Sequence, residues 1–421
     1  MRILLPNTTT TAIITTTSIL FLHSVVSLVT PSQDFLLSEQ SVNNANYIVK
    51  LISLPTDNWP FATTGEANTI GGRFHYMFGN YSQATLDFLQ SHPLVDYIEK
   101  NTVVKATAYE KNPPSWGLDR IDQETFPLDQ AYNYPDSGGE GVDVFVIDTG
   151  IYVEHQDFDG RAKWGVTVIN SPSTDLNGHG TFTAAIIGGR TFGVAKKASL
   201  YAVKALNSEG EGSTLTLLKG LQYVSQMHQL KANKKTIVNL SLGTAYNRVI
   251  NEAVNIAVEE GIVVVVAAGN GINGIDGQDA CRFSPASASE VIAVGSTQIN
   301  DAVSVFSNYG PCVTVYAPGD SVTSAFVGSP IATTTLSGTS FAAPHVSGVA
   351  ALILGNSTNA LTPREVKDRI LAIATKNSIK NLPVDSPNLL LNNRIENYFS
   401  STGNTLKIPT LILFMLIMVI Y

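Results

Sequence analysis

The sequence predicts an α/β fold in which helices cover both faces of a mostly parallel sheet, preceded by a smaller α+β module. From residue 142 onward, short apolar runs alternate with helical patterns, which is typical of βαβ units. Some of the runs, such as Ile262–Ala267, are continuously apolar, as expected for strands buried on both faces. We expect strands at Val142–Ile147, Ser199–Ala205, Thr236–Leu240, Ile262–Ala267, Val291–Gly295 and Val313–Ala317. We expect helices at His179–Ile187, Ser213–His228, Arg248–Glu260, Thr339–Leu354 and Pro363–Ala374.

The composition narrows the range of functions. The chain has 421 residues, of which 44% are hydrophobic and 14% charged, so it can bury a large core. It carries 26 Lys and Arg against 34 Asp and Glu, a net charge of −8. Nucleic-acid binding needs a basic surface, so we expect no nucleic-acid partner. The two cysteines are too few for a disulfide scaffold, or for a structural zinc site by themselves.

The first residues are typical of an export signal. Arg2 is followed by a Thr-rich stretch, an apolar run at Ser18–Val29 and polar residues at Thr30–Gln33. This order predicts a secretory signal peptide over residues 1–30. The alternative, a buried helix of the mature protein, is disfavoured because no amphipathic pattern accompanies the run.

The chain also ends on an apolar run. Ile408–Tyr421 is shorter than the ~20 residues that a bilayer-spanning helix needs. The small residues Ser400–Asn404 precede it, a pattern typical of GPI-attachment signals, although the polar spacer is shorter than usual. For residues 400–421 we favour a lipid-attachment signal that places the protein on a membrane. A short tail anchor and a structural or functionless tail are the alternatives.

The upstream module reads as a small α+β unit. Strand patterns occur at Tyr47–Ile52, Val95–Lys100 and Thr102–Ala106, and a short helix is expected at Ser82–Gln90. The polar, Pro-containing stretch Tyr109–Ser115 marks its end. We therefore expect a module over residues 31–108 and the main domain over residues 109–399.

Three residues with complementary chemistry stand at the ends of predicted elements. Asp148 ends an apolar strand, His179 lies between two glycines at a helix start, and Ser340 opens a long apolar helix. A serine hydroxyl becomes a good nucleophile when a base removes its proton, and a carboxylate must orient that base. Ser340 would also lie near the positive end of the helix dipole. The chain order acid, base, nucleophile therefore predicts a catalytic triad.

Other interpretations of these residues are weaker. Asp136 and Asp148 lie too close in sequence to supply the two lobes of an aspartic-protease site. No second histidine follows His179 at metal-binding spacing, which argues against a zinc site. Ser340 does not stand in a Gly-x-Ser-x-Gly elbow, and as a single residue it could serve as a helix N-cap.

The segments around the triad resemble those of subtilisin-like serine proteases. Trp116–Ile121, Phe306–Gly310 and Tyr316–Gly319 are similar to the proteinase K and fungal vacuolar (cerevisin-like) branch, and the resemblance runs to the helix after Pro363. It implies a subtilisin-like three-layer fold. The upstream module resembles the inhibitor-type propeptide of the family, a ferredoxin-like fold that would act as an intramolecular inhibitor.

The resemblance implies a role for each site residue. Asp148 would be the orienting acid, His179 the general base and Ser340 the nucleophile. Asn270 would form the oxyanion hole together with the backbone N–H of Ser340. Two segments without an acidic residue would bind the substrate backbone and form the wall of the pocket before the scissile bond, which favours large apolar side chains there. These segments are Ser241, Leu242, Gly243 and Ala267, Ala268, Gly269.

The chain departs from its relatives at three informative positions. Phe341 follows the nucleophile where relatives usually carry Met, which removes an oxidisable sulfur. Thr244 stands where relatives often have a second glycine, which narrows that subsite. Thr314 replaces an aspartate that ligates calcium in some relatives, which argues against a calcium site there. The expected chemistry requires no cofactor and no metal.

Cys281 and Cys312 match cysteines that are disulfide-linked in some relatives, and a disulfide is favoured over two free buried thiols. Four N-x-S/T sequons occur. Asn7 lies in the expected signal and Asn239 in a buried strand. Asn80 and Asn356 are therefore the expected glycosylation sites.

Together these features predict a secreted serine endopeptidase made as a zymogen, with proteins or peptides as substrates. It would enter the secretory pathway and reach the extracellular space or the cell surface, with the vacuole as the alternative. The rival hypothesis is a catalytically silent surface protein that keeps the fold to bind peptides or cell-wall partners.

Overall fold

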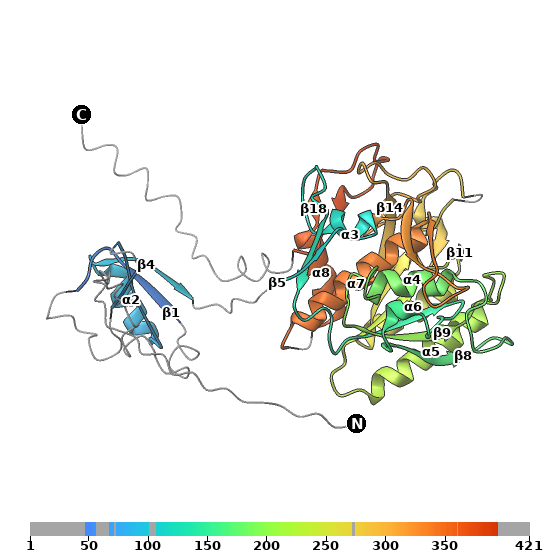
Figure 1. Ribbon diagram of the computed structural model, residues 1–421, viewed down its shortest axis with the longest axis horizontal. Helices are drawn as coiled ribbons and strands as arrows, with labels where there is room; N and C mark the ends of the chain where they lie inside the picture. The colour runs from blue at the N-terminus through green and yellow to red at the C-terminus, as the bar shows by residue number, and fades with distance from the viewer. Residues whose placement is uncertain are drawn as a thin grey trace, which may run out of the picture. The chain divides into compact units, whose positions relative to one another are not determined.

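The structure is a computed structural model that describes residues 47–55, 67–70, 73–100, 107–271, 274–359 and 361–394. The predicted signal peptide, the strand at Thr102–Ala106 and the C-terminal tail lie outside the described residues. The chain divides into two compact units, Met1–Thr102 and Val103–Tyr421 (Figure 1). The boundary expected at residue 108 stays a prediction, and Thr107–Lys111 forms a strand that pairs with Ala131–Pro135.

The first unit is a four-stranded antiparallel sheet with one described helix. Its strands are β1 (Tyr47–Leu51), β2 (Asn68–Ile70), β3 (Phe74–Gly79) and β4 (Val95–Lys100), in the order β2-β3-β1-β4. The helix α2 (Gln83–Ser91) begins where the Ser82 side chain accepts a hydrogen bond from the Thr85 N–H. Leu89 from this helix packs on Val49, Leu51 and Met77 of the sheet.

The second unit is built on a nine-stranded sheet with the order β18-β19-β15-β14-β12-β10-β7-β9-β8. Pairing is parallel from β19 to β8, and only β18 is antiparallel. The strands are β7 (Asp143–Asp148), β8 (Ala162–Thr167), β9 (Ser199–Lys204), β10 (Thr236–Leu240), β12 (Val263–Ala267), β14 (Ile292–Thr297), β15 (Val315–Pro318), β18 (Thr375–Lys376) and β19 (Leu389–Leu390).

Helices cover both faces of this sheet. One face packs against α3 (Trp116–Ile121), α4 (His179–Gly188), α7 (Thr339–Asn356) and α8 (Pro363–Ile373). The other packs against α5 (Thr214–Leu230) and α6 (Arg248–Glu259). Within β7, Val144 and Val146 join the first core, whereas Phe145 and Ile147 join the second. The predicted three-layer α/β fold is confirmed, since the continuous apolar runs supply both faces.

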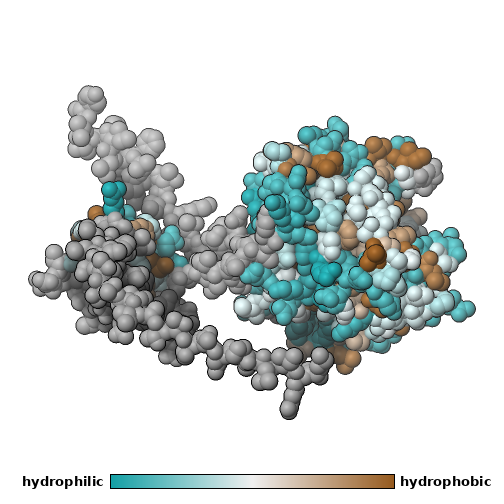
Figure 2. Space-filling view, viewed as in Figure 1, coloured by the Kyte–Doolittle hydropathy of each residue, from teal (hydrophilic) through white to brown (hydrophobic). Residues whose placement is uncertain are grey.

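The remaining elements are short. Three two-stranded sheets join β5 (Thr107–Lys111) to β6 (Ala131–Pro135), β11 (Thr244–Ala245) to β13 (Phe283–Ser284), and β16 (Val322–Ala325) to β17 (Thr333–Leu336). The 3-10 turns η2 (Gln156–Phe158) and η3 (Ala280–Arg282) complete the unit. Among the residues described, no helix is both long and apolar enough to span a bilayer. On the face that Figure 2 shows, the hydrophobic patches of the second unit are small and separate.

Candidate active site

Asp148 and His179 lie in direct hydrogen-bond contact. Asp148 is the last residue of β7 and is fully buried, and His179 is the first residue of α4. The His179 Nδ1 atom lies 2.8 Å from Asp148 Oδ1 and 2.9 Å from Oδ2. Asp148 Oδ1 also accepts the Thr149 N–H at 2.6 Å. The carboxylate is thus held in place, and it orients the imidazole with Nδ1 as the donor and Nε2 as the free base.

The backbone approaches the acid closely at Gly180. A Cβ at this position would lie 2.1 Å from the Gly150 carbonyl oxygen and 3.1 Å from Asp148 Oδ1. Any side chain here would force α4 away from β7. Glycine therefore brings His179 within reach of Asp148, as the flanking glycines in the sequence suggested.

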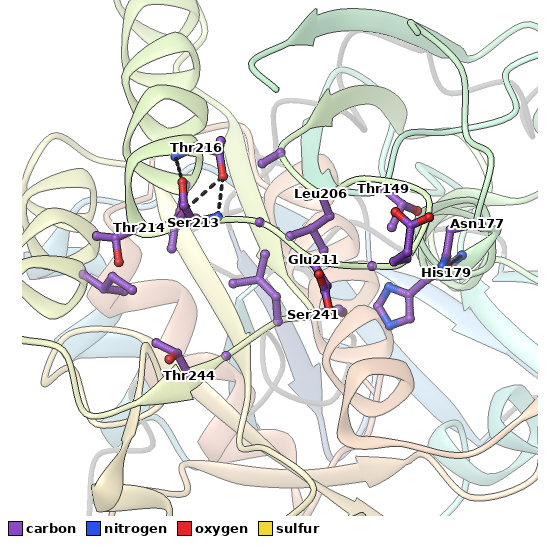
Figure 3. A pocket seen from close by; sticks show the side chains of 18 of the residues that line it. Thr149, Asn177, His179, Leu206, Glu211, Ser213, Thr214, Thr216, Ser241 and Thr244 are labelled. Atoms are coloured by element: carbon purple, nitrogen blue, oxygen red, sulfur yellow. Dashed lines mark hydrogen bonds between the residues drawn. The ribbon is translucent and has the colours of Figure 1, made fainter. Parts of the chain in front are cut away.

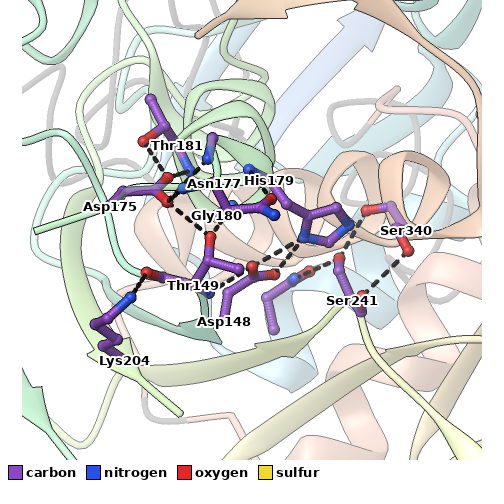
Figure 4. Close-up of polar contacts among 12 residues, drawn as sticks. Asp148, Thr149, Asp175, Asn177, His179, Gly180, Thr181, Lys204, Ser241 and Ser340 are labelled. Carbon is purple, nitrogen blue, oxygen red and sulfur yellow. Dashed lines mark hydrogen bonds and ion pairs between the residues drawn. The ribbon is translucent and has the colours of Figure 1, made fainter. Parts of the chain in front are cut away.

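A second buried carboxylate, Asp175, holds the segment on both sides of His179. Its Oδ1 accepts the backbone N–H groups of Asn177 and Gly178, at 3.0 and 2.9 Å. Its Oδ2 accepts the Thr181 N–H at 3.0 Å and the Thr181 hydroxyl at 2.6 Å. The His179 backbone is therefore fixed by contacts that do not involve its ring (Figure 4).

Thr149 links the two carboxylates to a buried lysine. Its hydroxyl donates to Asp175 Oδ1 at 2.9 Å and accepts the Gly180 N–H at 2.9 Å. Its carbonyl oxygen accepts a 2.6 Å hydrogen bond from Nζ of the fully buried Lys204. The sequence analysis did not identify Asp175, Thr149 or Lys204. The only local signal was the position of Asp175 four residues before His179.

The surrounding charges determine the basicity of His179. Burial lowers the pKa of the imidazole, but the charge of Asp148, its hydrogen bond and the charge of Asp175 outweigh burial and raise the pKa above its usual value. Burial lowers the pKa of Lys204, while the charges of Asp175 and Asp148 oppose that effect. His179 is therefore a stronger base than an isolated histidine.

Ser340 lies in the first turn of α7, on the far side of the imidazole from Asp148 (Figure 4). Its hydroxyl donates to the Ser241 carbonyl oxygen at 3.1 Å, and the Ser241 hydroxyl donates to the Ser340 carbonyl oxygen at 2.6 Å. To pass its proton to His179, the Ser340 hydroxyl must turn from Ser241 toward the imidazole. Catalytic hydrogen bonds in ligand-free structures are often loose in this way.

A buried hydrogen-bonded chain connects Ser241 to the sheet and to α7. The Asn239 side chain donates through Nδ2 to the Ser241 hydroxyl at 2.9 Å and accepts the Ser347 hydroxyl at 2.8 Å. Asn239 is fully buried in β10, and both ends of its amide are engaged. The exclusion of Asn239 as a glycan acceptor agrees with this burial.

Asn270 follows β12 and is oriented by Thr339. Its Oδ1 accepts both the Thr339 N–H and the Thr339 hydroxyl at 2.8 Å. Thr339 Oγ1 also accepts the Gly269 N–H at 3.1 Å. Because Oδ1 is occupied by two donors, Asn270 presents Nδ2 as a hydrogen-bond donor beside the first turn of α7. Thr339 is a further residue that the sequence analysis did not identify.

The loop that carries Asn270 is held by the buried Asn308. The Asn308 Nδ2 atom donates to the Ala268 carbonyl oxygen at 2.8 Å, and its Oδ1 accepts the Gly271 N–H at 2.9 Å. Gly269 has a φ of +100°, and a Cβ there would lie 2.5 Å from Asn308 Nδ2. The Phe306–Gly310 motif thus supports the loop from behind.

A cleft of about 790 Å³ opens beside these residues. His179 and the predicted substrate-binding residues Ser241, Leu242 and Gly243 line it (Figure 3). Thr244, which stands where relatives often have a second glycine, also lines the cleft. Ala267, Ala268 and Gly269 do not line this cleft, and Ala267 and Ala268 are buried.

Phe341 packs against the imidazole of His179. Its ring centroid lies 5.4 Å from that of His179 and 4.5 Å from that of Phe182. The aromatic residue therefore fills the space next to the base with carbon atoms only. This contact gives the unusual residue after Ser340 a structural role.

The predicted disulfide between Cys281 and Cys312 is present, with the two Cα atoms 5.2 Å apart. Of the predicted glycan acceptors, Asn80 is exposed after β3 and Asn356 is half-buried at the end of α7. The Thr314 hydroxyl accepts the Ala293 N–H at 3.2 Å, so this position offers an engaged hydroxyl where calcium would need a carboxylate. In the part of the chain that the structure describes, no group of three or more His, Cys, Asp or Glu side chains is placed to hold a metal ion.

The arrangement has the parts that nucleophilic acyl transfer requires. A hydroxyl lies beside an imidazole, a buried carboxylate orients that imidazole, and an amide N–H₂ faces the same helix N-terminus. These residues come from the ends of two parallel strands, β7 and β12, and from the first turns of two helices, α4 and α7, which meet at the carboxyl edge of the sheet. Ligands of open α/β sheets bind at this edge.

Comparison with known proteins gives consistent results. Residues 139–389 match the model of the subtilase family. The chain is 40% identical to the subtilisin-like serine protease pepC of Aspergillus niger, over 79% of this chain and 67% of that protein. It is 40% identical to cerevisin of Saccharomyces cerevisiae, over 77% of this chain and 54% of that protein.

Among solved structures, a cold-adapted subtilisin-like serine proteinase matches with a TM-score of 0.61 and 38% identity. The match covers 66% of this chain and 97% of that one. The chain thus spans about two thirds of the length of pepC and about half that of cerevisin.

Proposed function

The chain belongs to the subtilase family of serine endopeptidases, and from this premise we propose that it hydrolyses peptide bonds with Asp148, His179 and Ser340 as its catalytic triad. The observation that carries the proposal is the meeting of these three side chains at one edge of the sheet, with the imidazole between the carboxylate and the hydroxyl.

In the first half of the reaction, His179 Nε2 takes the proton of Ser340 as Oγ attacks the substrate carbonyl carbon. Asp148 stabilises the imidazolium that forms and keeps its own charge. His179 then gives the proton to the leaving amine, and the acyl group remains on Ser340. In the second half, water attacks the acyl-enzyme with the same proton relay, which releases the carboxylate product and restores Ser340.

Negative charge develops on the substrate oxygen in each half-reaction. The Asn270 Nδ2 atom and the Ser340 backbone N–H would donate to this oxygen, and the N-terminus of α7 adds a positive partial charge. Thr339 contributes indirectly, because its two hydrogen bonds to Oδ1 keep Asn270 in the donating orientation. This mechanism uses side chains and backbone dipoles, and it requires no metal.

The substrate would lie along Ser241–Gly243, whose backbone borders the cleft, as an extended strand. Neither this segment nor Ala267–Gly269 carries an acidic side chain. We therefore propose a preference for large apolar residues immediately before the scissile bond. Thr244 would narrow the neighbouring position.

The zymogen is part of the same proposal. The compact first unit, with its four-stranded sheet and separate core, is the module that would assist folding and block the cleft until cleavage between Lys105 and Asn112. We propose export through the secretory pathway to the extracellular space or the cell surface, with lipid attachment at the C-terminus and glycans at Asn80 and Asn356.

Labelling with a fluorophosphonate tests the catalytic proposal. One probe should attach per folded molecule, at Ser340, and Ser340→Ala should abolish labelling. Ser289→Ala, an exposed serine on the surface, is the matched control and should label normally. A folded wild-type chain that does not react would instead indicate the catalytically silent protein.

Maturation is tested with the same variant. If the precursor cleaves itself, Ser340→Ala should accumulate as the full-length precursor. Mass spectrometry of the termini would then locate the cleavage site in the wild type and show whether a lipid replaces Ile408–Tyr421. A Ser340→Ala chain that matures normally would point to processing by another protease.

A further inference from the structure

The cleft beside His179 carries a charge that the catalytic mechanism does not use. Among the described residues that line it, Glu209 and Glu211 are the only Asp, Glu, Lys or Arg side chains. Both are exposed, so they are in contact with solvent until a substrate covers them. A peptide that enters this cleft therefore meets two negative charges and no compensating lysine or arginine.

The segment that carries the two glutamates is fixed by its own backbone contacts. Asn207 Oδ1 accepts the N–H groups of Glu209 and Glu211, at 3.0 and 2.8 Å. The Asn207 N–H donates to the Glu211 carbonyl oxygen at 2.8 Å. Asn177, two residues before His179, donates to the Ser208 carbonyl oxygen at 2.8 Å. The position of the two charges is therefore tied to the position of the catalytic base.

The glutamates lie across the cleft from the substrate-binding edge. Residues 209–213 and 241–244 line the cleft, and Figure 3 shows Glu211 and Ser213 on one side of it and Ser241 and Thr244 on the other. Figure 3 shows Glu211 between Leu206 and Ser241, near His179. Ser241 marks the scissile-bond end of the edge, because its carbonyl oxygen lies 3.1 Å from Ser340 Oγ.

We propose that Glu209 and Glu211 are specificity-determining residues that favour substrates with a lysine or arginine two to four residues before the scissile bond. This inference rests on the proposed function. The position immediately before the bond is excluded, because its proposed walls, Ser241–Gly243 and Ala267–Gly269, contain no acid. The preferred substrate is then a peptide with an apolar residue at the cleavage point and a basic residue upstream of it.

The expected size of the preference follows from exposure. Ion pairs between solvent-exposed groups contribute about 0.2–1 kcal/mol, and that range corresponds to a factor of about 1.4 to 5 in kcat/KM for each glutamate. Salt should weaken the preference, because the Debye length falls from about 10 Å at 0.1 M to about 3 Å at 1 M ionic strength. A purely steric preference would not respond to salt.

The experiment uses the mature enzyme and peptide p-nitroanilides that carry Phe before the scissile bond. The second, third or fourth position holds either Lys or norleucine, which has the same stem without the charge. In the wild type, the Lys to norleucine ratio of kcat/KM should exceed about 3 at one or more positions at low salt. Glu209→Gln and Glu211→Gln should each lower this ratio, and the double variant should bring it close to 1.

The controls separate this inference from the catalytic proposal. Glu140→Gln removes an exposed acid before β7, at the opposite end of that strand from Asp148, and should leave the ratio unchanged. A wild-type ratio of 1 or less at all three positions would overturn the inference, as would a ratio that survives the double variant. Failure to cleave the norleucine substrates at all would instead refute the proposed function.

Discussion

Lys204 and Asp148 are register partners at the adjacent ends of two parallel strands, and both are fully buried. They do not form a direct ion pair. Lys204 donates to the carbonyl oxygen of Thr149, and the Thr149 N–H donates to Asp148. With Asp175, the site holds two buried carboxylates and one buried ammonium group next to His179. Among the described residues, the exposed Glu209 and Glu211 are the acids that line the cleft beside His179.

This charge arrangement predicts the acid limb of the pH–rate profile. The general base must be neutral, and the pKa of His179 is raised above the usual histidine value. As the pH falls, kcat/KM should therefore decline at a higher pH than an unperturbed histidine would give. The measurement is kcat/KM for a neutral substrate across the acid range. An acid limb with an apparent pKa at or below that of an ordinary histidine would contradict the assignment of His179 as the general base.

Removing the negative charge of Asp175 and removing the positive charge of Lys204 should shift the acid limb of the pH–rate profile in opposite directions. Asp175→Asn removes a negative charge that stabilises the imidazolium, so the limb should shift to lower pH and kcat should fall. Lys204→Met removes a positive charge that offsets the carboxylates, so the limb should shift to higher pH. Fluorophosphonate titration gives the fraction of folded enzyme, and each profile is normalised to it. Two shifts of the same sign would show that packing, rather than charge, controls His179.

The oxyanion site predicts a graded loss of turnover. Asn270→Ala should lower kcat by about 10²- to 10³-fold, the range seen for such a donor in subtilisin, a member of this family, with little change in KM. Thr339→Val should cause a smaller loss of roughly tenfold, because Asn270 keeps one of its two hydrogen bonds to residue 339.

Thr339→Ser retains the hydroxyl and serves as the control for the threonine variant. Its kcat should stay close to that of the wild type. If Thr339→Ser loses as much activity as Thr339→Val, the methyl group rather than the hydroxyl is what matters, and the orienting role is wrong.

The disulfide should matter for stability and not for chemistry. Cys281 and Cys312 close a loop with a sequence separation of 31 residues. In the chain-entropy model, removing such a cross-link lowers the free energy of unfolding by about 3–4 kcal/mol. The variant Cys281→Ser/Cys312→Ser, unfolded in urea, tests this value. Its activity per labelled active site should equal that of the wild type, and a drop in that quantity would contradict a purely structural role.

Phe341 predicts resistance to oxidation. The ring next to His179 contains no sulfur, whereas a methionine there would be oxidised to a polar sulfoxide beside the catalytic base. The wild type should keep most of its activity in hydrogen peroxide, and Phe341→Met should lose it progressively. Phe182→Met is the control, because it places the same sulfur at a ring that packs on Phe341, with the two centroids 4.5 Å apart. Equal sensitivity of the two variants would argue against a specific effect at residue 341.

The sequence predicted the central strands well, because a strand buried on both faces is mostly apolar. Thr236–Leu240 was predicted with the bounds that the structure has, although Thr236 and Asn239 are polar. The end of β14 was predicted two residues early, at Gly295, because Ser296 and Thr297 are polar but buried, with Ser296 Oγ bonded to Ser304 Oγ at 2.7 Å. The edge strand β8 was not predicted, because an edge strand contacts solvent and has no continuous apolar run.

A site residue was predictable where a chemically reactive side chain directly ends an apolar strand, as Asp148 does. Lys204 was not predictable, because a lysine at a strand end is ordinarily exposed, and its burial depends on a carbonyl oxygen that the fold supplies. The role of Thr339 was likewise not predictable, since its hydrogen bonds join α7 to Asn270, which lies 69 residues earlier in the sequence. Such contacts arise only when distant segments meet.

The burial of Asn239 has a consequence for how the chain is made. The Asn239 amide is part of an N-x-S sequon, yet in the folded protein both its oxygen and its nitrogen are engaged, and it connects β10 to the residues that hold the nucleophile. A sugar attached there could not fit inside the sheet. A glycan at Asn239 would therefore mark molecules modified before this strand was enclosed, and the sugar status of this asparagine records the order of folding and modification.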